Sequence, residues 1–326
     1  MAANPSSKMV VYAALVGNLL VALTKVFAAA WTGSSAMWSE AVHSLVDTGN
    51  GVLLLYGFRR AAQRPDASHP LGYGREIYFW SFIVAVLMFA LGSGVSIYQG
   101  ILHVRNPTPI EDPAVNYIVL ALSFLFEGAS WWVALKRFRA AKGELGYYEA
   151  FRRSKDPPAF MVLFEDSAAL VGILIAAAGN FAAVSLDAPA VDGVASILIG
   201  LILGAVAALL ARESKSLLIG EPADPALTQS IIEIAAAEPA VSRVNGLITV
   251  QLAPDQIVAA LSLEFADELR TPDIEQAVIA IEQKVRARHP NVVAVFVKPQ
   301  TDTTFRSARR RRFGQQPPAN PTISRE

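Results

Sequence analysis

Three ionisable residues, Glu40, His43 and Asp47, lie in a stretch of sequence that is otherwise largely apolar. In a helix, their spacings of three, four and seven residues place them on one face. Charged groups inside a bilayer are costly, so they usually pair, line a cavity or bind an ion. An imidazole and a carboxylate four residues apart, as in His43 and Asp47, supply two ligands for a divalent cation such as Zn²⁺. Two ligands do not complete a site, so others must come from another helix.

Two further apolar stretches contain acidic residues that could supply them. Glu165 and Asp166 are adjacent, about 100° apart around a helix, so at most one points squarely at the helix that carries His43. Glu127 and Asp166 lie at similar depths by residue count, roughly 10–12 Å from one end of their helices. The alternatives are a structural, hydrogen-bonded role for Glu127 and a capping, gating, pairing or proton-carrying role for Glu40.

The composition indicates a membrane protein with a modest soluble part. The chain has 326 residues, of which 53% are hydrophobic and 17% charged. It contains no cysteine, which excludes disulfides, thiolate zinc sites and cysteine nucleophiles. The formal net charge is zero, so no bulk field favours a nucleic-acid partner. We identify no removable signal peptide, because no cleavage-site pattern follows a short apolar core.

The fold class that we predict is a bundle of six transmembrane helices followed by a small α+β domain. A membrane-spanning helix needs about 20 apolar residues, and six stretches qualify: 9–31, 36–58, 77–102, 114–135, 159–183 and 189–211. Lys and Arg gather in the loops between the second and third and between the fourth and fifth helices: Arg59, Arg60, Arg64, Arg75, Lys136, Arg137, Arg139, Lys142, Arg152, Arg153 and Lys155. The positive-inside rule then predicts that both termini are cytoplasmic.

The remainder of the chain has the element order α-β-β-α-β. Helices are expected over 224–239, capped by Asp224, and over 271–290, capped by Thr271; strands are expected over 244–253, 256–265 and 291–299. The predicted parts are 1–8, a cytoplasmic N-terminus; 9–212, the six-helix domain; 213–298, a cytoplasmic domain; and 299–326, a disordered basic tail. The domain is short for an independent core, which favours a homodimer. The basic run in the tail is either a solvated cluster or a contact with anionic membrane lipid.

The sequence resembles the cation diffusion facilitator family of proton-coupled metal exporters. The resemblance covers residues 9–298 and rests on "HSLVD" in the second helix and "DASHPLGYGREIYFW" before the third, with the predicted element order. The segments "SEAVHSLVD", "FEGASWW" and "FEDSAA" together suggest the branch that includes zinc transporter nine.

The resemblance implies that His43, Asp47 and Asp166 are ligands of a transported metal. The family's other fifth-helix ligand falls on Val162, which cannot coordinate, so Glu165 or Glu127 is the candidate for the fourth ligand. Asp66 and His69 match two ligands of an accessory site, where Tyr73 replaces a third, which predicts weak binding at most. The soluble domain lacks the histidines that bind zinc in many members, so we expect it to serve dimerisation.

The expected function is secondary transport of a divalent cation, foremost Zn²⁺ and otherwise Mn²⁺, Co²⁺, Fe²⁺ or Cd²⁺, in exchange for protons, with no permanent cofactor. The alternative is a membrane metal sensor or scaffold that keeps the fold without transporting, motivated by Val162. A proton-coupled carrier of a non-metal solute is a further alternative. We expect no enzyme, because the metalloprotease, nucleophile-elbow and phosphate-loop motifs are absent from the sequence. A bacterial inner membrane is the expected host, with an organelle membrane as the alternative.

Overall fold

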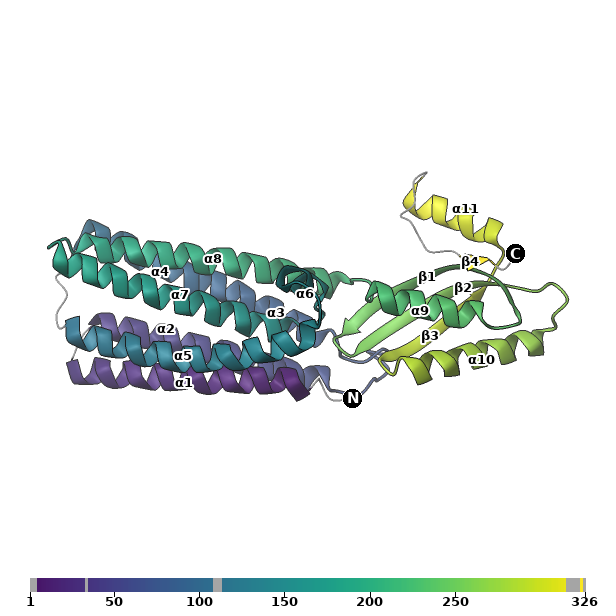
Figure 1. Cartoon of the computed structure of the whole chain (residues 1–326), viewed down its shortest axis with the longest axis horizontal. Coiled ribbons are helices and arrows are strands. Elements are labelled where there is room, and N and C mark those ends of the chain that lie inside the picture. Colours follow the sequence, from purple (N-terminus) through teal and green to yellow (C-terminus); the bar gives the residue numbers. More distant parts are fainter. Residues whose placement is uncertain (1–4, 33–34, 108–112, 315–322, 325–326) are drawn as a thin grey trace. The chain divides into compact units, whose positions relative to one another are not determined.

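The computed structural model describes residues 5–32, 35–107, 113–314 and 323–324, and it divides between Leu218 and Ile219 into two compact units. The first unit is a bundle of long helices (Figure 1). Its elements are α1 (Pro5–Thr32), α2 (Ser35–Ala61), α3 (Glu76–Leu87), the π-helical turn η1 (Met88–Ser93), α4 (Gly94–Arg105), α5 (Pro113–Lys142), α6 (Tyr147–Arg153), α7 (Pro157–Ser185) and α8 (Ala190–Ile219). The six predicted spans therefore correspond to α1, α2, the α3–η1–α4 segment, α5, α7 and α8.

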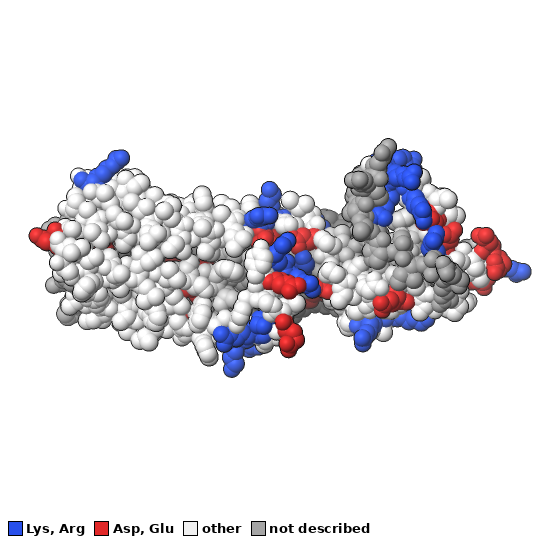
Figure 2. Space-filling view, turned by 45° about the horizontal axis from the view of Figure 1, so that its top comes forward, with Lys and Arg blue, Asp and Glu red and all other residues white. Residues whose placement is uncertain are grey.

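Five helical segments within the described residues are long and apolar enough to cross a membrane: Lys8–Phe27, Glu76–Arg105, Ala114–Lys142, Pro157–Ser185 and Ala190–Ile219. Figure 2 shows the corresponding long flank of the bundle almost without charged side chains. The α2 helix has the length of a span, but it is not among the five. Its sequence includes Glu40, His43 and Asp47, the residues with which the functional prediction began.

The third span is not a continuous α-helix, because the π-helical turn η1 interrupts it. The Ser93 side chain, at the end of this turn, lies against α8: a Cβ added to Gly204 would be 2.6 Å from Ser93 Oγ. Further along the same pair of helices, a Cβ on Gly100 would lie 2.7 Å from the carbonyl oxygen of Gly193. Glycines therefore allow α4 and α8 to approach backbone to backbone, as small residues do in membrane bundles.

An ion pair joins the end of α2 to the beginning of α3. Arg60 Nε and Nη2 both donate to Glu76 Oε1, at 3.2 and 3.0 Å, and Trp80 Nε1 donates to Glu76 Oε2 at 2.8 Å. The charge-assisted bonds fix the relative position of these two helix ends. The end of α2 is thereby joined to the beginning of the third span.

The second unit contains the predicted order α-β-β-α-β. It comprises α9 (Pro225–Ala236), β1 (Val241–Ala253), β2 (Gln256–Phe265), α10 (Thr271–Arg288), β3 (Val292–Pro299), α11 (Asp302–Phe313) and β4 (Ile323–Ser324). The strand order is β3-β2-β1-β4, with β2 and β3 parallel and the other pairs antiparallel. One face of the sheet packs with α9 and α10, where Ile231, Leu261 and Ile281 share a buried core.

Several boundaries differ from the prediction. The division between units falls at 218/219 rather than 212/213, because α8 continues to Ile219. Asp224 caps α9 as predicted, accepting from the Ala226 backbone N–H at 2.8 Å. Thr271, however, is the first residue of α10, and Arg270 is its cap. The short helix α6 was not predicted.

The prediction of a disordered tail over 299–326 was wrong for its first part. Residues 302–313 form α11, and Ile323–Ser324 pair with β1. The helix was missed because its arginine-rich sequence has little apolar periodicity. At its beginning it also contacts residues that are distant in sequence, Arg243 on β1 and Glu264 on β2. Residues 315–322 and 325–326 lie outside the described part of the chain.

Candidate metal site in the transmembrane bundle

Three helices bring acidic side chains into one region of the bundle. Asp47 comes from α2, Glu127 from α5, and Glu165 and Asp166 from α7. The α1 helix packs against α2, α5 and α7, and α5 packs against α7. Glu165 lies within the electrostatic reach of Asp47, Glu127 and Asp166, and Asp166 within that of Glu127 and Asp47. The predicted gathering of these carboxylates is therefore present in the structure.

Asp166 is the most enclosed member of this group. It is 1% exposed, and its Oδ2 accepts a hydrogen bond of 2.7 Å from Ser130 Oγ on α5. The next residues on both helices form a second bond between α5 and α7, in which Trp131 Nε1 donates to Ser167 Oγ at 2.9 Å. Ser167 Oγ in turn donates to the Leu163 carbonyl within α7 at 2.6 Å. The two side-chain bonds hold α5 and α7 in one register.

The carboxylates are close enough to influence one another, yet they do not form a preassembled metal cage. Among the described residues, no three His, Asp or Glu side chains are positioned to hold a single ion. The side chains of Glu40 and His43 lie outside the described ones, and with them the imidazole that was predicted to complete the site. Val162 is 2% exposed and packs in the apolar core of the bundle.

Three polar residues near the carboxylates were not identified from the sequence. Asn50 is buried one turn after Asp47 and lies near Glu165. Lys25 on α1 is a positive charge within the electrostatic reach of Glu127. Ser130 is the hydrogen-bond donor to Asp166. Lys25 could have been found as the one basic residue well inside the first apolar stretch, where a charge requires a partner; the other two give no comparable signal.

Removing the Ser130 hydroxyl should weaken zinc binding. Groups that orient metal ligands typically contribute 10- to 100-fold in affinity, so we expect Ser130→Ala to raise the apparent KM for Zn²⁺ by about tenfold. Ser130→Thr, which keeps the hydroxyl, should restore it. The control is Ser123→Ala on the same helix, because Ser123 Oγ is buried without a hydrogen-bond partner among the described residues. An unchanged KM in Ser130→Ala would contradict a role of Ser130 in positioning Asp166 for metal binding.

Asp66 and His69, the predicted accessory pair, lie together in the loop between α2 and α3. Asp66 Oδ1 accepts from the backbone N–H groups of Ser68 and His69 at 2.9 and 2.8 Å, and Oδ2 accepts from Tyr73 Oη at 2.7 Å. The His69 ring packs on the Tyr73 ring, 4.1 Å between centroids. These contacts give Asp66 a structural role in the loop. Metal binding by the pair stays a prediction.

The Asp66 hydrogen bonds predict how the loop responds to pH. The Tyr73 hydroxyl, followed by the backbone N–H groups, lowers the pKa of Asp66 below its ordinary value, so the bonds stabilise the loop at neutral pH. They should be lost only as the pH falls below about 4 and the carboxyl is protonated. At pH 7, Asp66→Ala should speed hydrogen exchange of the Ser68 and His69 amides by roughly tenfold.

His69→Ala is the matched control for that measurement, since it removes the ring contact but keeps the acceptor. Unchanged exchange in Asp66→Ala would contradict the structural role. Adding Zn²⁺ to the wild-type protein tests the accessory site separately: slower exchange that depends on both Asp66 and His69 would support metal binding there.

Comparisons with known proteins agree with the architecture. The profile of the "Cation efflux transmembrane domain" matches residues 11–219. The "Proton-coupled zinc antiporter SLC30A9, mitochondrial" of Xenopus laevis is 35% identical over 259 residues, covering 78% of this chain and 46% of that protein. "Metal tolerance protein C4" of Arabidopsis thaliana is 38% identical over 67% of this chain and 48% of its own length. "Cation-efflux pump FieF" of Escherichia fergusonii is 26% identical over 87% of this chain and 89% of its own. The chain thus spans a little under half the length of the first two relatives.

Proposed function

Since this chain belongs to the cation efflux family, we propose that it is a secondary transporter that moves a divalent metal cation across a membrane in exchange for protons. The observation that carries the proposal is the presence of Asp47, Glu127, Glu165 and Asp166 in one region of an apolar bundle. Four acidic groups inside a membrane domain are costly unless a cation or protons neutralise them. The names of the similar antiporters and efflux pumps support the same function.

The proposed coupling follows from the chemistry of the ligands. A carboxylate or imidazole must be deprotonated to bind a metal, so metal binding releases protons and protonation favours metal release. Asp47, Asp166 and His43 are the ligands that we propose, with Glu165 or Glu127 as the fourth. In the described conformation no three of the described acidic side chains are placed to hold one ion, so metal binding would require these side chains to rearrange.

Zn²⁺ is the metal that we propose, with Mn²⁺, Co²⁺, Fe²⁺ and Cd²⁺ as further substrates. Imidazole favours Zn²⁺ over Mn²⁺, whereas each added carboxylate weakens that preference. The metal is cargo, and we propose no permanent cofactor. Lys and Arg in the α2–α3 and α5–α7 loops favour cytoplasmic termini, which makes the cytoplasm one of the two sides at which the metal binds. Export driven by inward proton flow is the direction that the family resemblance implies. A bacterial inner membrane is the host that we propose, and the mitochondrial relatives make an organelle membrane the alternative.

A non-transporting metal sensor or scaffold is the second candidate. The buried Val162, in place of a ligand, favours it. Purified protein in liposomes distinguishes the two functions, with a zinc-sensitive dye inside the vesicles. Transport predicts zinc entry that Asp47→Asn abolishes, whereas Asp187→Asn, in the turn between α7 and α8, should leave entry intact. No entry of any of the five metals with wild-type protein would favour the sensor.

We further propose that the protein is a homodimer that pairs through the sheet face opposite α9 and α10, away from the end of that face where α11 contacts Arg243 and Glu264. Cross-strand neighbours Ile248, Ala260 and Phe296 form an apolar row on the face opposite α9 and α10. Ile248 is 50% and Phe296 57% exposed, and the next row, Val250, Val258 and Ala294, is also apolar. A second copy in the same membrane presents an identical row at the same height, as an interface with two-fold symmetry requires.

The absence of cysteine from the sequence allows this interface to be tested with one introduced thiol. We expect Ala260→Cys to form disulfide-linked dimers under mild oxidation, because the row is central to the proposed contact. Adding Phe296→Asp should reduce the linked fraction by roughly tenfold, as loss of a central aromatic contact does. The control thiol is Ile279→Cys, which is exposed on α10 behind the sheet. Equal crosslinking at both positions would contradict the proposed face.

A further inference from the structure

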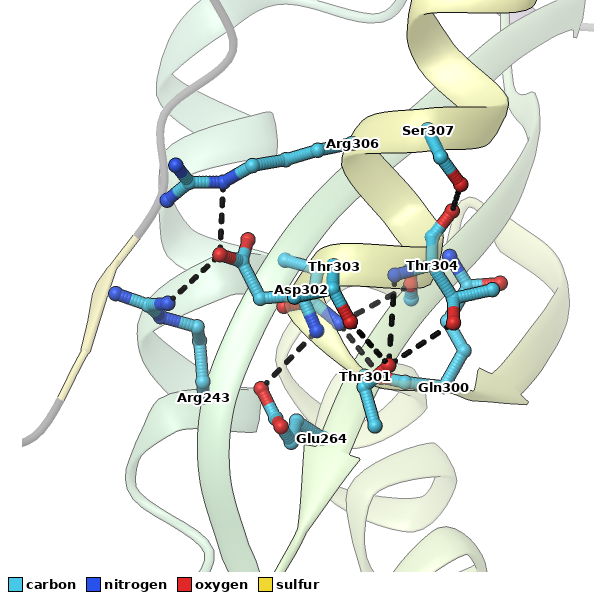
Figure 3. Close-up of polar contacts among 11 residues, drawn as sticks. Arg243, Glu264, Gln300, Thr301, Asp302, Thr303, Thr304, Arg306 and Ser307 are labelled. Carbon is cyan, nitrogen blue, oxygen red and sulfur yellow. Dashed lines mark hydrogen bonds and ion pairs between the residues drawn. The ribbon is translucent and has the colours of Figure 1, made fainter.

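The helix α11 begins at a fixed point on the sheet. Gln300, which precedes it, donates its backbone N–H to the Leu263 carbonyl at 2.9 Å and accepts from Asn245 Nδ2 at 2.8 Å. Thr301 caps the helix by accepting from the Thr304 backbone N–H. Asn245 is fully buried. The start of α11 is therefore part of the folded domain (Figure 3).

Four charged groups next to this start balance one another. Asp302 Oδ2 pairs with Arg243 Nη1 at 3.0 Å and with Arg306 Nε at 2.7 Å. The Asp302 backbone N–H donates to Glu264 Oε2 at 3.2 Å. Figure 3 shows these contacts from β1, β2 and α11 meeting at the first turn of the helix. Two arginines and two carboxylates leave this anchor without net charge.

The rest of the helix is basic and without a counter-charge. Arg309, Arg310 and Arg311 make no ion pair among the described residues, and Arg310 and Arg311 are exposed. Figure 2 shows Lys and Arg side chains gathered where α11 lies. Arg306 and Arg310 also share one helix face, where like charges repel. The anchor thus holds an unbalanced positive surface on the domain.

The arginine side chains of this surface are suited to bind the phosphate groups of membrane lipids. All the basic residues of α11 are arginine, whose planar guanidinium binds phosphate through two hydrogen bonds. Phe305 and Ala308 are half-buried, so the described exposed face of α11 carries charge without large apolar side chains. Such a helix binds at the level of lipid headgroups rather than inserting. Residues 220–224, a linker of at most about 18 Å, join the domain to α8, which keeps it near a bilayer surface.

We propose that α11 is a binding site for anionic phospholipid headgroups, with Arg309, Arg310 and Arg311 contacting phosphates and the Asp302 ion pairs holding the helix on its domain. Each arginine near an anionic surface strengthens binding by about fivefold, so three together contribute roughly a hundredfold. The contact is electrostatic, and salt should weaken it. Its consequence is that the position of the soluble domain responds to the lipid composition of the membrane.

The test uses the full chain in nanodiscs, labelled through a single introduced cysteine, Ser307→Cys, on the exposed side of α11. Energy transfer from the label to a headgroup-labelled lipid is measured in phosphatidylcholine alone and with added phosphatidylglycerol. We expect transfer to rise with the anionic lipid and to fall in high salt. Arg309→Gln, Arg310→Gln and Arg311→Gln together should abolish the rise.

The matched control removes three positive charges elsewhere on the domain, with Arg286→Gln, Arg288→Gln and Lys298→Gln, and should keep the rise. A second label at Gln283→Cys on α10 reports general movement of the domain. Equal transfer in neutral and anionic nanodiscs, or a rise that survives loss of the three α11 arginines, would overturn the proposal. A response of the Ser307 label to a single-stranded RNA oligonucleotide, with none to lipid, would overturn it in favour of a nucleic-acid partner.

Discussion

Zinc transport should fall by at least about 100-fold when Asp166 is replaced by asparagine, because a neutral amide is a poor zinc ligand and even groups that only orient a ligand typically contribute 10- to 100-fold. The asparagine side chain has the same shape and can still accept from Ser130, so the bundle should fold. Zinc entry into proteoliposomes measures the effect, and circular dichroism and the thermal midpoint verify folding.

Asp187→Asn is the matched control for Asp166→Asn. Asp187 lies in the turn between α7 and α8 with a φ of 51°, a conformation that asparagine adopts readily. It should transport at the wild-type rate. An Asp166→Asn protein that folds and transports within a few-fold of wild type would remove Asp166 from the site.

Introducing histidine at Val162 should raise the affinity for Zn²⁺. Val162 lies one turn before Asp166 on the same face of α7, so an imidazole there supplies a neutral ligand beside the carboxylate. We expect the apparent KM for Zn²⁺ to fall by about tenfold or more and the maximal rate to fall with it, since a tighter site releases its metal more slowly. The preference for Zn²⁺ over Mn²⁺ should also increase.

Val162→Leu is the matched control for Val162→His. Position 162 is buried, so any larger side chain there disturbs the packing, and leucine adds volume without adding a ligand. The leucine variant should keep the wild-type KM. If Val162→His and Val162→Leu have the same affinity for Zn²⁺, the position does not face the metal site, and the assignment of Asp166 as its neighbour loses support.

The architecture was predictable because its signals are local. Apolar stretches of membrane length, the sorting of Lys and Arg among the loops and the helix cap at Asp224 can each be identified without knowledge of the folded chain. The π-helical turn at Met88–Ser93 could not, since its sequence is as apolar as the α-helix around it. The helix α11 was missed for a related reason: Asp302 stabilises it through Arg243, which is distant in sequence.

The candidate site was only partly predictable. Glu127, Glu165, Asp166 and Asp47 were identified because a carboxylate inside an apolar stretch is conspicuous, and the structure gathers them. Ser130 was not, because a serine in a transmembrane helix usually bonds to its own backbone. Its hydrogen bond to Asp166 depends on the register of α5 against α7. The side chains of His43 and Glu40 lie outside the described ones, so their roles stay predictions.

Coupling between metal and protons is the central claim, and one measurement tests it directly. Wild-type protein is reconstituted in liposomes that contain a pH dye, and a zinc gradient is imposed with no initial pH difference. Antiport predicts that protons move against the direction of zinc, that reversing the zinc gradient reverses them, and that Asp47→Asn abolishes both movements. Zinc flux without proton movement would contradict the proposed exchange, and no flux of either would show that the fold serves a purpose other than transport.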